Sequence, residues 1–156
     1  MTARNTIIRR RVLLALAALP LMRGEARAAA KPAITVHKDP NCGCCNGWVA
    51  HLRSHDFDVT AIETTALDQV KAKLGVPADL AACHTAEVGG YVVEGHVPAV
   101  AVERLLVERP DARGLAVPGM PAGSPGMGGE PEQYEAILFG GSSRRVYGRF
   151  KGDRPV

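Results

Sequence analysis

Three of the four cysteines of the chain fall within four residues, in the run Cys42-Gly43-Cys44-Cys45, and the fourth is Cys83. The run follows an alternating apolar stretch at 34–37, typical of a half-buried strand, and precedes an apolar stripe at 48–52, typical of a short helix. The cysteine loop therefore leads into a helix N-terminus, where backbone N–H groups and the helix dipole favour thiolate. Because thiolate is both a nucleophile and a soft-metal ligand, this loop supports either of two chemistries.

The rest of the pattern predicts further strands and helices in a fixed order. Strands are expected at 57–61, 84–88 and 91–94, and helices from a capping box at 65–68 to Gly75 and from Pro98 to just before Pro110. Gly89-Gly90 separates the last two strands, and this pair favours a two-residue hairpin turn. The predicted order is βαβαββα.

This order predicts an α/β fold with a thioredoxin-like arrangement, a small sheet with helices packed against it. A right-handed β-α-β crossover followed by an antiparallel hairpin gives this arrangement. In that arrangement the loop before the third strand returns beside the end of the first strand. We therefore expect Cys83 to face the loop that carries Cys42 to Cys45.

Residues 111–135 differ in composition, because they hold six Gly and four Pro and repeat Pro-Gly-Met at 118–120 and 125–127. A structureless stretch of this length is usually functional or disordered. A closing hairpin is predicted from strands at 136–139 and 145–150. The expected organisation is a thioredoxin-like metal-binding domain at 31–110, with a Met-containing loop and C-terminal hairpin at 111–156 packed on the same domain.

Residues 1–30 have the pattern of a cleavable export signal peptide. A basic segment ends at Arg9-Arg10-Arg11, an apolar stretch follows at 12–22, and small residues at 26–30 fit the A-x-A cleavage rule. The apolar stretch has 11 residues, whereas a membrane-spanning helix needs about 20. We therefore expect a periplasmic protein with no stable membrane insertion after cleavage.

Removal of this segment changes the charge of the chain. The 19 basic and 16 acidic residues fall to 13 and 15, which gives a formal charge of −2. The mature part of about 126 residues is long enough for one core, and it offers no basic footprint for nucleic acid. Export also exposes the thiols to an oxidising compartment, where they become disulfides unless something protects them.

Three interpretations of the cysteines remain open. As structural staples, a Cys42–Cys45 bridge would add about 2 kcal/mol and a Cys45–Cys83 bridge about 4 kcal/mol by loop entropy. As a redox motif, Cys42 would attack and Cys45 would resolve, although Cys44 and Cys83 would then trap mixed disulfides. Metal binding uses all four thiols, so we favour a non-enzymatic metal site and keep a thiol or copper oxidoreductase as the alternative.

The donor types favour Cu(I) over Zn(II). Thiolates accept either ion, whereas thioethers select Cu(I), and Met120 and Met127 belong to the two Pro-Gly-Met repeats. For each Met taken alone, an apolar plug that holds the loop to the body is the more common role, and the repeat of Pro-Gly-Met is what favours a ligand role. His84, adjacent to Cys83, is the candidate imidazole ligand. The other histidines are interpreted as structural or solvent-facing: His37, His51, His55 and His96.

Several segments of the mature chain together resemble the DUF411 family. They are Val36 to Trp48 with its Cys-Gly-Cys-Cys motif, Leu80 to Thr85, Gly90 to Pro98, Gly114 to Pro121 and Gly123 to Met127. The resemblance extends over nearly the whole mature chain. Members of this family include periplasmic copper-resistance proteins, so the resemblance implies a thioredoxin-like domain that binds copper through its cysteines.

The resemblance also implies roles for particular residues. Motif by motif, it assigns Cys42, Cys44, Cys45 and Cys83 as metal and redox thiols, and it marks Met120 and Met127 as family-typical residues. We therefore expect a protein that holds Cu(I) on a thiolate cluster in copper handling or resistance, with zinc as the second choice of metal. Its expected partners are the metal ion and other periplasmic copper-handling proteins.

Overall fold

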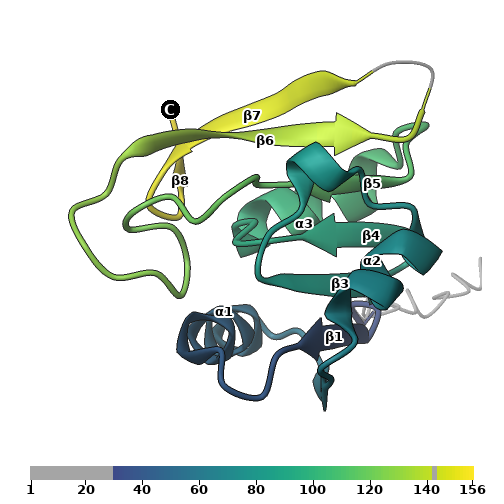
Figure 1. Cartoon of the computed structure of the whole chain (residues 1–156). Helices are drawn as coiled ribbons and strands as arrows, with labels where there is room; N and C mark the ends of the chain where they lie inside the picture. The colour runs from purple at the N-terminus through teal and green to yellow at the C-terminus, as the bar shows by residue number, and fades with distance from the viewer. Residues whose placement is uncertain (1–29, 142–143) are drawn as a thin grey trace, which may run out of the picture.

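The computed structural model of the chain describes residues 30–141 and 144–156. The predicted export signal lies outside the described residues, apart from Ala30. Within these ranges eight strands form one sheet in the order β2-β1-β3-β4-β5-β6-β7-β8, accompanied by three α-helices, so the predicted α/β class is confirmed (Figure 1). No helix among the described residues has the length and hydrophobicity needed to cross a membrane.

The elements follow the predicted order βαβαββα from Ile34 to Glu108. The strands are β1 (Ile34–Lys38), β2 (Val59–Glu63), β3 (His84–Val88), β4 (Tyr91–Glu94), β5 (Gly114–Ala116), β6 (Gln133–Phe139), β7 (Arg145–Lys151) and β8 (Arg154–Pro155). The helices are α1 (Gly43–Ser54), α2 (Leu67–Leu74) and α3 (Ala99–Glu108), with a short 3-10 turn η1 (Ala78–Leu80). β1 pairs parallel with β2 and antiparallel with β3, and β3 pairs antiparallel with β4.

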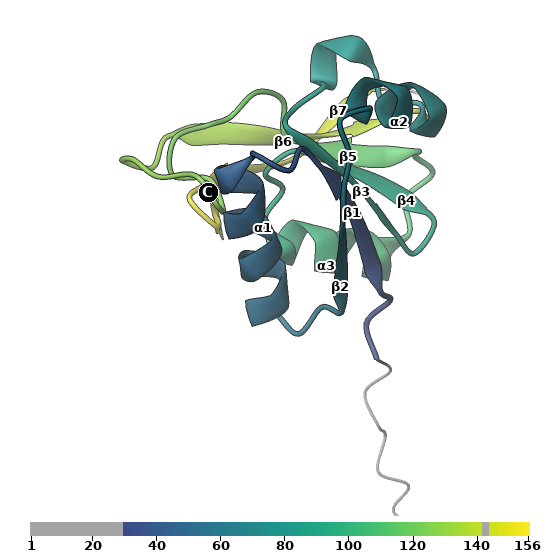
Figure 2. The same cartoon turned by 60° about the horizontal axis from the view of Figure 1, so that its bottom comes forward.

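The sheet is covered on both faces. Figure 2 shows α1 and α3 on one side of the sheet and α2 on the other. The larger core includes Trp48 and Leu52 of α1 and Leu105 of α3, whereas Leu74 of α2 packs in a second cluster with Phe139. Because both faces of β4 are covered, all four of its residues are buried, including the charged Glu94.

Three local predictions between residues 57 and 98 need correction. The second strand was expected at 57–61 and runs instead from Val59 to Glu63; Phe57 and Val59 are buried, but the rest of β2 is exposed because it is the edge strand. The capping box is also wrong: α2 begins after Ala66 with no side-chain cap, and the Thr64 hydroxyl instead accepts the Ala66 N–H. Pro98 is the N-cap of α3 and lies just outside its first turn.

The turns were predicted more accurately than the caps. Gly75 ends α2 with a φ of 76°, and Gly89 and Gly90 have φ values of 55° and 89° in the β3–β4 turn. The register pairs Val88 with Tyr91 across that turn. These are the left-handed conformations that glycine adopts without steric cost.

The region at 111–135 is more ordered than a structureless loop. β5 lies within it and joins β4 to β6, and β6 begins at Gln133, three residues before the predicted start. The predicted hairpin of β6 and β7 is present, and β8 adds a short strand at the end of the sheet. The three residues of β5 were too few for a periodic pattern to be recognised in the sequence.

The second Pro-Gly-Met repeat is packed directly on α1. A Cβ atom added at Gly126 would overlap the backbone nitrogen of Trp48 and lie 2.6 Å from the carbonyl oxygen of Cys44. A Cβ added at Gly47 would lie 2.8 Å from the Cα of Gly126. Close approach of two backbones therefore requires glycine on both sides and holds the loop against the cysteine-bearing helix.

We expect Gly126→Ala to destabilise the protein much more than Gly119→Ala. Both residues have positive φ, 88° and 72°, so each substitution incurs a conformational cost of about 1–2 kcal/mol. A Cβ at Gly119 meets nothing within 4 Å, whereas overlap at Gly126 adds about 1–3 kcal/mol. Thermal unfolding of the two variants measures the difference, and equal melting temperatures would show that the loop does not press on α1.

Candidate metal centre

The cysteines of the run lie at the start of α1. Cys42 is the N-cap of the helix, and its sulfur forms a disulfide with Cys45. Cys44 and Cys83 are the free cysteines of the described chain. The Cys44 sulfur lies 3.4 Å from that of Cys42 and 3.8 Å from that of Cys83. The approach of Cys83 to this loop is thus as the sequence predicted.

All four sulfurs belong to one compact group. Each lies within 4.8 Å of the others, and the residues come from two segments that the fold brings together. The disulfide joins the pair that the redox interpretation named, so the alternative staple between Cys45 and Cys83 is wrong for this structure. A purely structural role for the cysteines does not explain why two free thiols, Cys44 and Cys83, lie beside the disulfide.

Cys83 also belongs to a second group, with two buried imidazoles. Its sulfur lies 3.4 Å from Nδ1 of His84 and 3.0 Å from Nε2 of His96. The predicted adjacency of His84 is therefore a real contact. His96 was expected to be structural or solvent-facing, and the structure shows instead that it is fully buried and points at the thiol.

The orientation of His96 is set by the Pro-Gly-Met loop. Its Nδ1 lies 2.7 Å from the carbonyl oxygen of Pro125, which only accepts hydrogen bonds, so we place the ring proton on Nδ1. Nε2 then presents its lone pair toward Cys83. A backbone carbonyl that fixes the tautomer in this way is the usual outer partner of a metal-binding histidine.

His96 could have been found from the sequence by counting along the hairpin. The two-residue turn pairs Val88 with Tyr91, and the same register pairs Thr85 with Glu94. Extended by two further residues, the register brings Cys83 opposite His96. The sequence therefore contains a signal for His96. To find it, one must continue the strand pairing outward from the Gly89-Gly90 turn, because the residues around His96 show no local pattern of their own.

Burial keeps both imidazoles neutral. Burial, followed by the charges of His96 and Lys71, lowers the pKa of His84 to about 3, and burial also lowers the pKa of His96. The Nε2 atom of His84 has no hydrogen-bond partner among the described residues. Neutral rings near pH 7 keep a lone pair available, which is the form that binds a metal.

The Cys83 thiol, by contrast, is a weak acid in the metal-free protein. Burial and then the neighbouring Cys44 raise the pKa of Cys83 to about 12. A bound cation would have to displace the thiol proton, so metal binding here is coupled to proton release. The thiolate form expected for the cysteine loop is therefore not expected for Cys83 until a metal binds.

The two methionines have different environments. Met120 is 57% exposed and lines a hollow of about 360 Å³ together with Cys83 and Lys71. Met127 is half-buried, and its backbone N–H bonds the carbonyl oxygen of Ser124. The structure thus brings Met120 to the mouth of the site beside Cys83, and it places Met127 next to the glycine that contacts α1.

The remaining histidines lie outside both groups, as predicted. His37 approaches Glu87 at 3.4 Å, and His51 accepts the N–H of Ala99. His55 lies 3.9 Å from Glu103.

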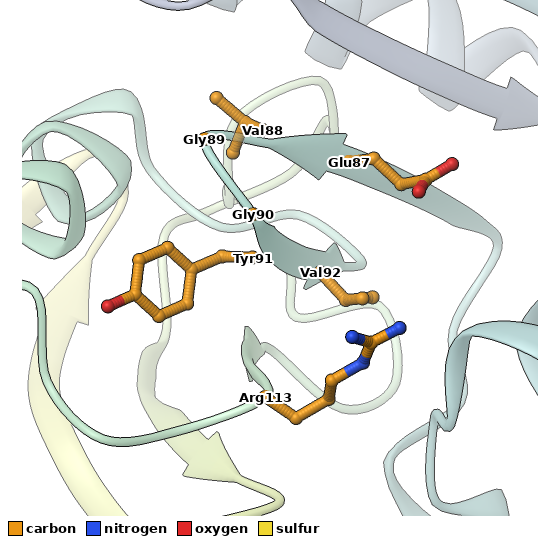
Figure 3. Close-up of a pocket in the computed structure, with 7 residues that line it drawn as sticks. All are labelled: Glu87, Val88, Gly89, Gly90, Tyr91, Val92 and Arg113. Atoms are coloured by element: carbon orange, nitrogen blue, oxygen red, sulfur yellow. The ribbon is translucent and has the colours of Figure 1, made fainter.

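Another hollow, of about 300 Å³, lies at the turn end of the β3–β4 hairpin, and Figure 3 shows its lining. Tyr91 points to one side of β4, and Val92 and Arg113 lie on the other side. The lining has no cysteine or histidine. The candidate centre is therefore at the opposite end of this hairpin, beside Cys83.

The donor set is soft. Four sulfurs and two neutral imidazoles converge within a few ångströms, with a thioether at the mouth. Such donors suit Cu(I) or Zn(II), while Mg²⁺ and Ca²⁺ require oxygen ligands. The arrangement can hold a soft cation when the thiols are reduced, or exchange electrons through a cysteine pair.

Comparison with known proteins agrees with this chemistry. The profile described as "Protein of unknown function, DUF411" matches residues 80–127. Two solved structures of copper resistance protein CopG, forms 1 and 2, are each 43% identical to the chain with a TM-score of 0.71. The matches cover 78% and 77% of this chain and 99% and 98% of those chains. No curated protein matches the chain significantly. The chain therefore belongs to the DUF411 family, and within it resembles copper resistance protein CopG.

Proposed function

We propose that this protein binds Cu(I) on a cluster of cysteine thiolates and acts in copper handling or resistance. The observation that carries the proposal is the convergence of four sulfurs from two segments, Cys42 to Cys45 and Cys83, within 4.8 Å. A staple needs only two of these sulfurs. The likeness to a copper-resistance protein supports copper as the metal. The test is anaerobic binding of Cu(I) to the reduced protein in competition with a Cu(I) chelator.

The cluster has candidate ligands beyond the cysteines. His84 and His96 are proposed as imidazole donors, because both are neutral, buried and in contact with Cys83. Met120 is proposed as a thioether donor at the mouth of the site, with Met127 as a weaker candidate. Zn(II) remains the alternative metal for the thiolates and imidazoles alone.

Three further proposals place this site in its setting. The order β2-β1-β3-β4, with β1 and β2 parallel and β3 and β4 antiparallel, supports a thioredoxin-like arrangement for residues 31–110. The loop and hairpin at 111–156 are proposed to pack on the same domain. The basic and apolar pattern of residues 1–30 supports export to the periplasm, where other copper-handling proteins would be the partners.

A copper or thiol oxidoreductase is the second candidate, and the Cys42–Cys45 disulfide favours it. Oxidation of two thiols to one disulfide releases two protons and two electrons, which suffice to reduce two Cu(II) ions to Cu(I). The reduced pair would hold Cu(I), whereas its oxidation to the disulfide would supply the electrons and remove two thiolate ligands.

The methionines should discriminate between the two metals. We expect replacement of both Met120 and Met127 by Leu to weaken Cu(I) binding by about tenfold, or about 1.4 kcal/mol, and to leave Zn(II) binding nearly unchanged. Leu preserves apolar volume and removes the thioether. Because Met120 lines the hollow beside Cys83, most of the loss should appear in Met120→Leu alone. Equal Cu(I) affinities of the double variant and the parent would make both residues packing groups.

A further inference from the structure

A buried ion pair lies behind the candidate metal centre. Glu94 on β4 is fully buried, and Lys71 on α2 is 7% exposed. The Lys71 ammonium donates hydrogen bonds to Glu94 Oε1 and, at 2.9 Å, to the Thr85 hydroxyl. Charges this well buried cost much desolvation, and apolar residues of similar volume are often as stable or more stable. Stability alone is therefore a weak reason for the pair.

The other hydrogen bonds of Glu94 go to the segment that carries Cys83 and His84. Glu94 Oε1 accepts the backbone N–H of Ala82 at 2.6 Å, and Oε2 accepts the Thr85 hydroxyl at 2.6 Å. Ala82 and Thr85 are the residues immediately before and after Cys83-His84. One carboxylate thus fixes the chain at both ends of this donor dipeptide.

The Glu94 residue is also linked to His96, the third proposed donor, through the backbone that follows β4. His96 follows Glu94 by two residues, and the intervening Gly95 donates its N–H to the His84 carbonyl oxygen at 3.1 Å. Cys83, His84 and His96 are therefore all held by backbone that Glu94 fixes. Lys71 supplies the charge without which this buried carboxylate would be unpaired.

We propose that Lys71 and Glu94 are positioning residues, which hold Cys83, His84 and His96 in the orientation that binds the metal. This rests on the proposed function. Neither side chain is assigned as a ligand, because the Lys71 ammonium and the Glu94 carboxylate bond each other, the Thr85 hydroxyl and the Ala82 N–H. His84 faces α1 instead, with its ring tilted against that of Trp48 at a centroid distance of 4.3 Å. Lys71 lines the hollow that also contains Cys83 and Met120, and the pair acts on the donors through backbone and hydroxyl contacts.

The experiment compares two double variants with the parent. Lys71→Leu with Glu94→Leu removes both charges together, leaves no unpaired buried charge and adds no thioether to the hollow that Lys71 shares with Cys83, so the fold is expected to persist. Lys71→Leu with Glu94→Gln also removes both charges but keeps an oxygen that can accept the Ala82 N–H. Glu87→Gln is the matched control, because Glu87 lies on β3 with its carboxylate exposed and outside this network.

Each reduced protein is titrated anaerobically with Cu(I) against a chelator, and its ultraviolet charge-transfer spectrum and melting temperature are recorded. We expect the Leu/Leu variant to bind Cu(I) about 10- to 100-fold more weakly, with an altered spectrum. The Leu/Gln variant should recover part of the loss, and Glu87→Gln should match the parent.

A folded Leu/Leu variant that binds Cu(I) like the parent, with the same spectrum, would overturn the positioning role. Unfolding of both double variants would also overturn it, because the pair would then be a stability element. A parent that binds no Cu(I) would overturn the proposed function, and this inference with it. The parent titration therefore separates the two failures.

Discussion

Cys83→Ser is expected to lower Cu(I) affinity by about 100-fold, or about 2.8 kcal/mol, and to lower the number of ions bound, while the protein stays folded. Cys83 is the sulfur shared by the thiol group and by the group with His84 and His96, so its loss affects both. Serine keeps the size of the side chain and removes the soft donor. Cys83 takes no part in the disulfide, so the melting temperature should change little.

The control for this variant is Cys44→Ser, which removes a sulfur from only one of the two groups. We expect a smaller loss of affinity for Cys44→Ser than for Cys83→Ser. A Cys45–Cys83 staple, which the structure does not contain, would instead make Cys83→Ser lose about 4 kcal/mol of stability with metal binding unaffected. Bound copper and melting temperature, measured on both variants, separate the two accounts.

The oxidation state of the Cys42–Cys45 pair should control how much copper binds. In the disulfide both sulfurs lack the thiolate that binds Cu(I), so only Cys44 and Cys83 remain as thiol donors. We expect two reactive thiols and much weaker Cu(I) binding in the oxidised protein, against four thiols and tight binding after reduction. Because the bridge closes a very short loop, reduction should lower unfolding free energy by only about 2 kcal/mol.

A variant that lacks the bridge provides the control for this effect. Cys42→Ser with Cys45→Ser removes both bridge sulfurs. Its Cu(I) affinity should be low even under reducing conditions, because only Cys44 and Cys83 remain as thiol donors. Equal copper binding by oxidised and reduced parent protein would contradict the involvement of this pair.

Much of the fold was predictable because its determinants are local. Alternating and helical apolar patterns located the elements up to Glu108, and Gly89-Gly90 located the hairpin turn. The predictions failed where burial or strand formation depends on neighbouring strands of the sheet. The burial of β2 depends on its place at the sheet edge, and β5 depends on strands β4 and β6 on either side.

The candidate site was predictable where topology alone brings residues together. The order of elements was enough to bring Cys83 to the Cys42–Cys45 loop, whereas His96 required the hairpin register. The disulfide pairing stayed open in the sequence, because spacing permits more than one bridge.

Other features of the site depend on tertiary packing. The two Pro-Gly-Met repeats are alike in sequence, yet Gly126 packs on α1 and a Cβ at Gly119 would meet nothing. The Lys71–Glu94 pair had no sequence signal, since these residue types are normally exposed.

Thiol counting during anaerobic Cu(I) titration tests the central claim most directly. The fully reduced parent should show four reactive thiols before the metal is added, and Cu(I) should protect them, including Cys83. Alkylation of the thiols before titration should abolish tight Cu(I) binding. If all four thiols stay reactive in the presence of Cu(I), or if the alkylated protein binds Cu(I) as tightly as the reduced one, the cysteine cluster is not the copper site.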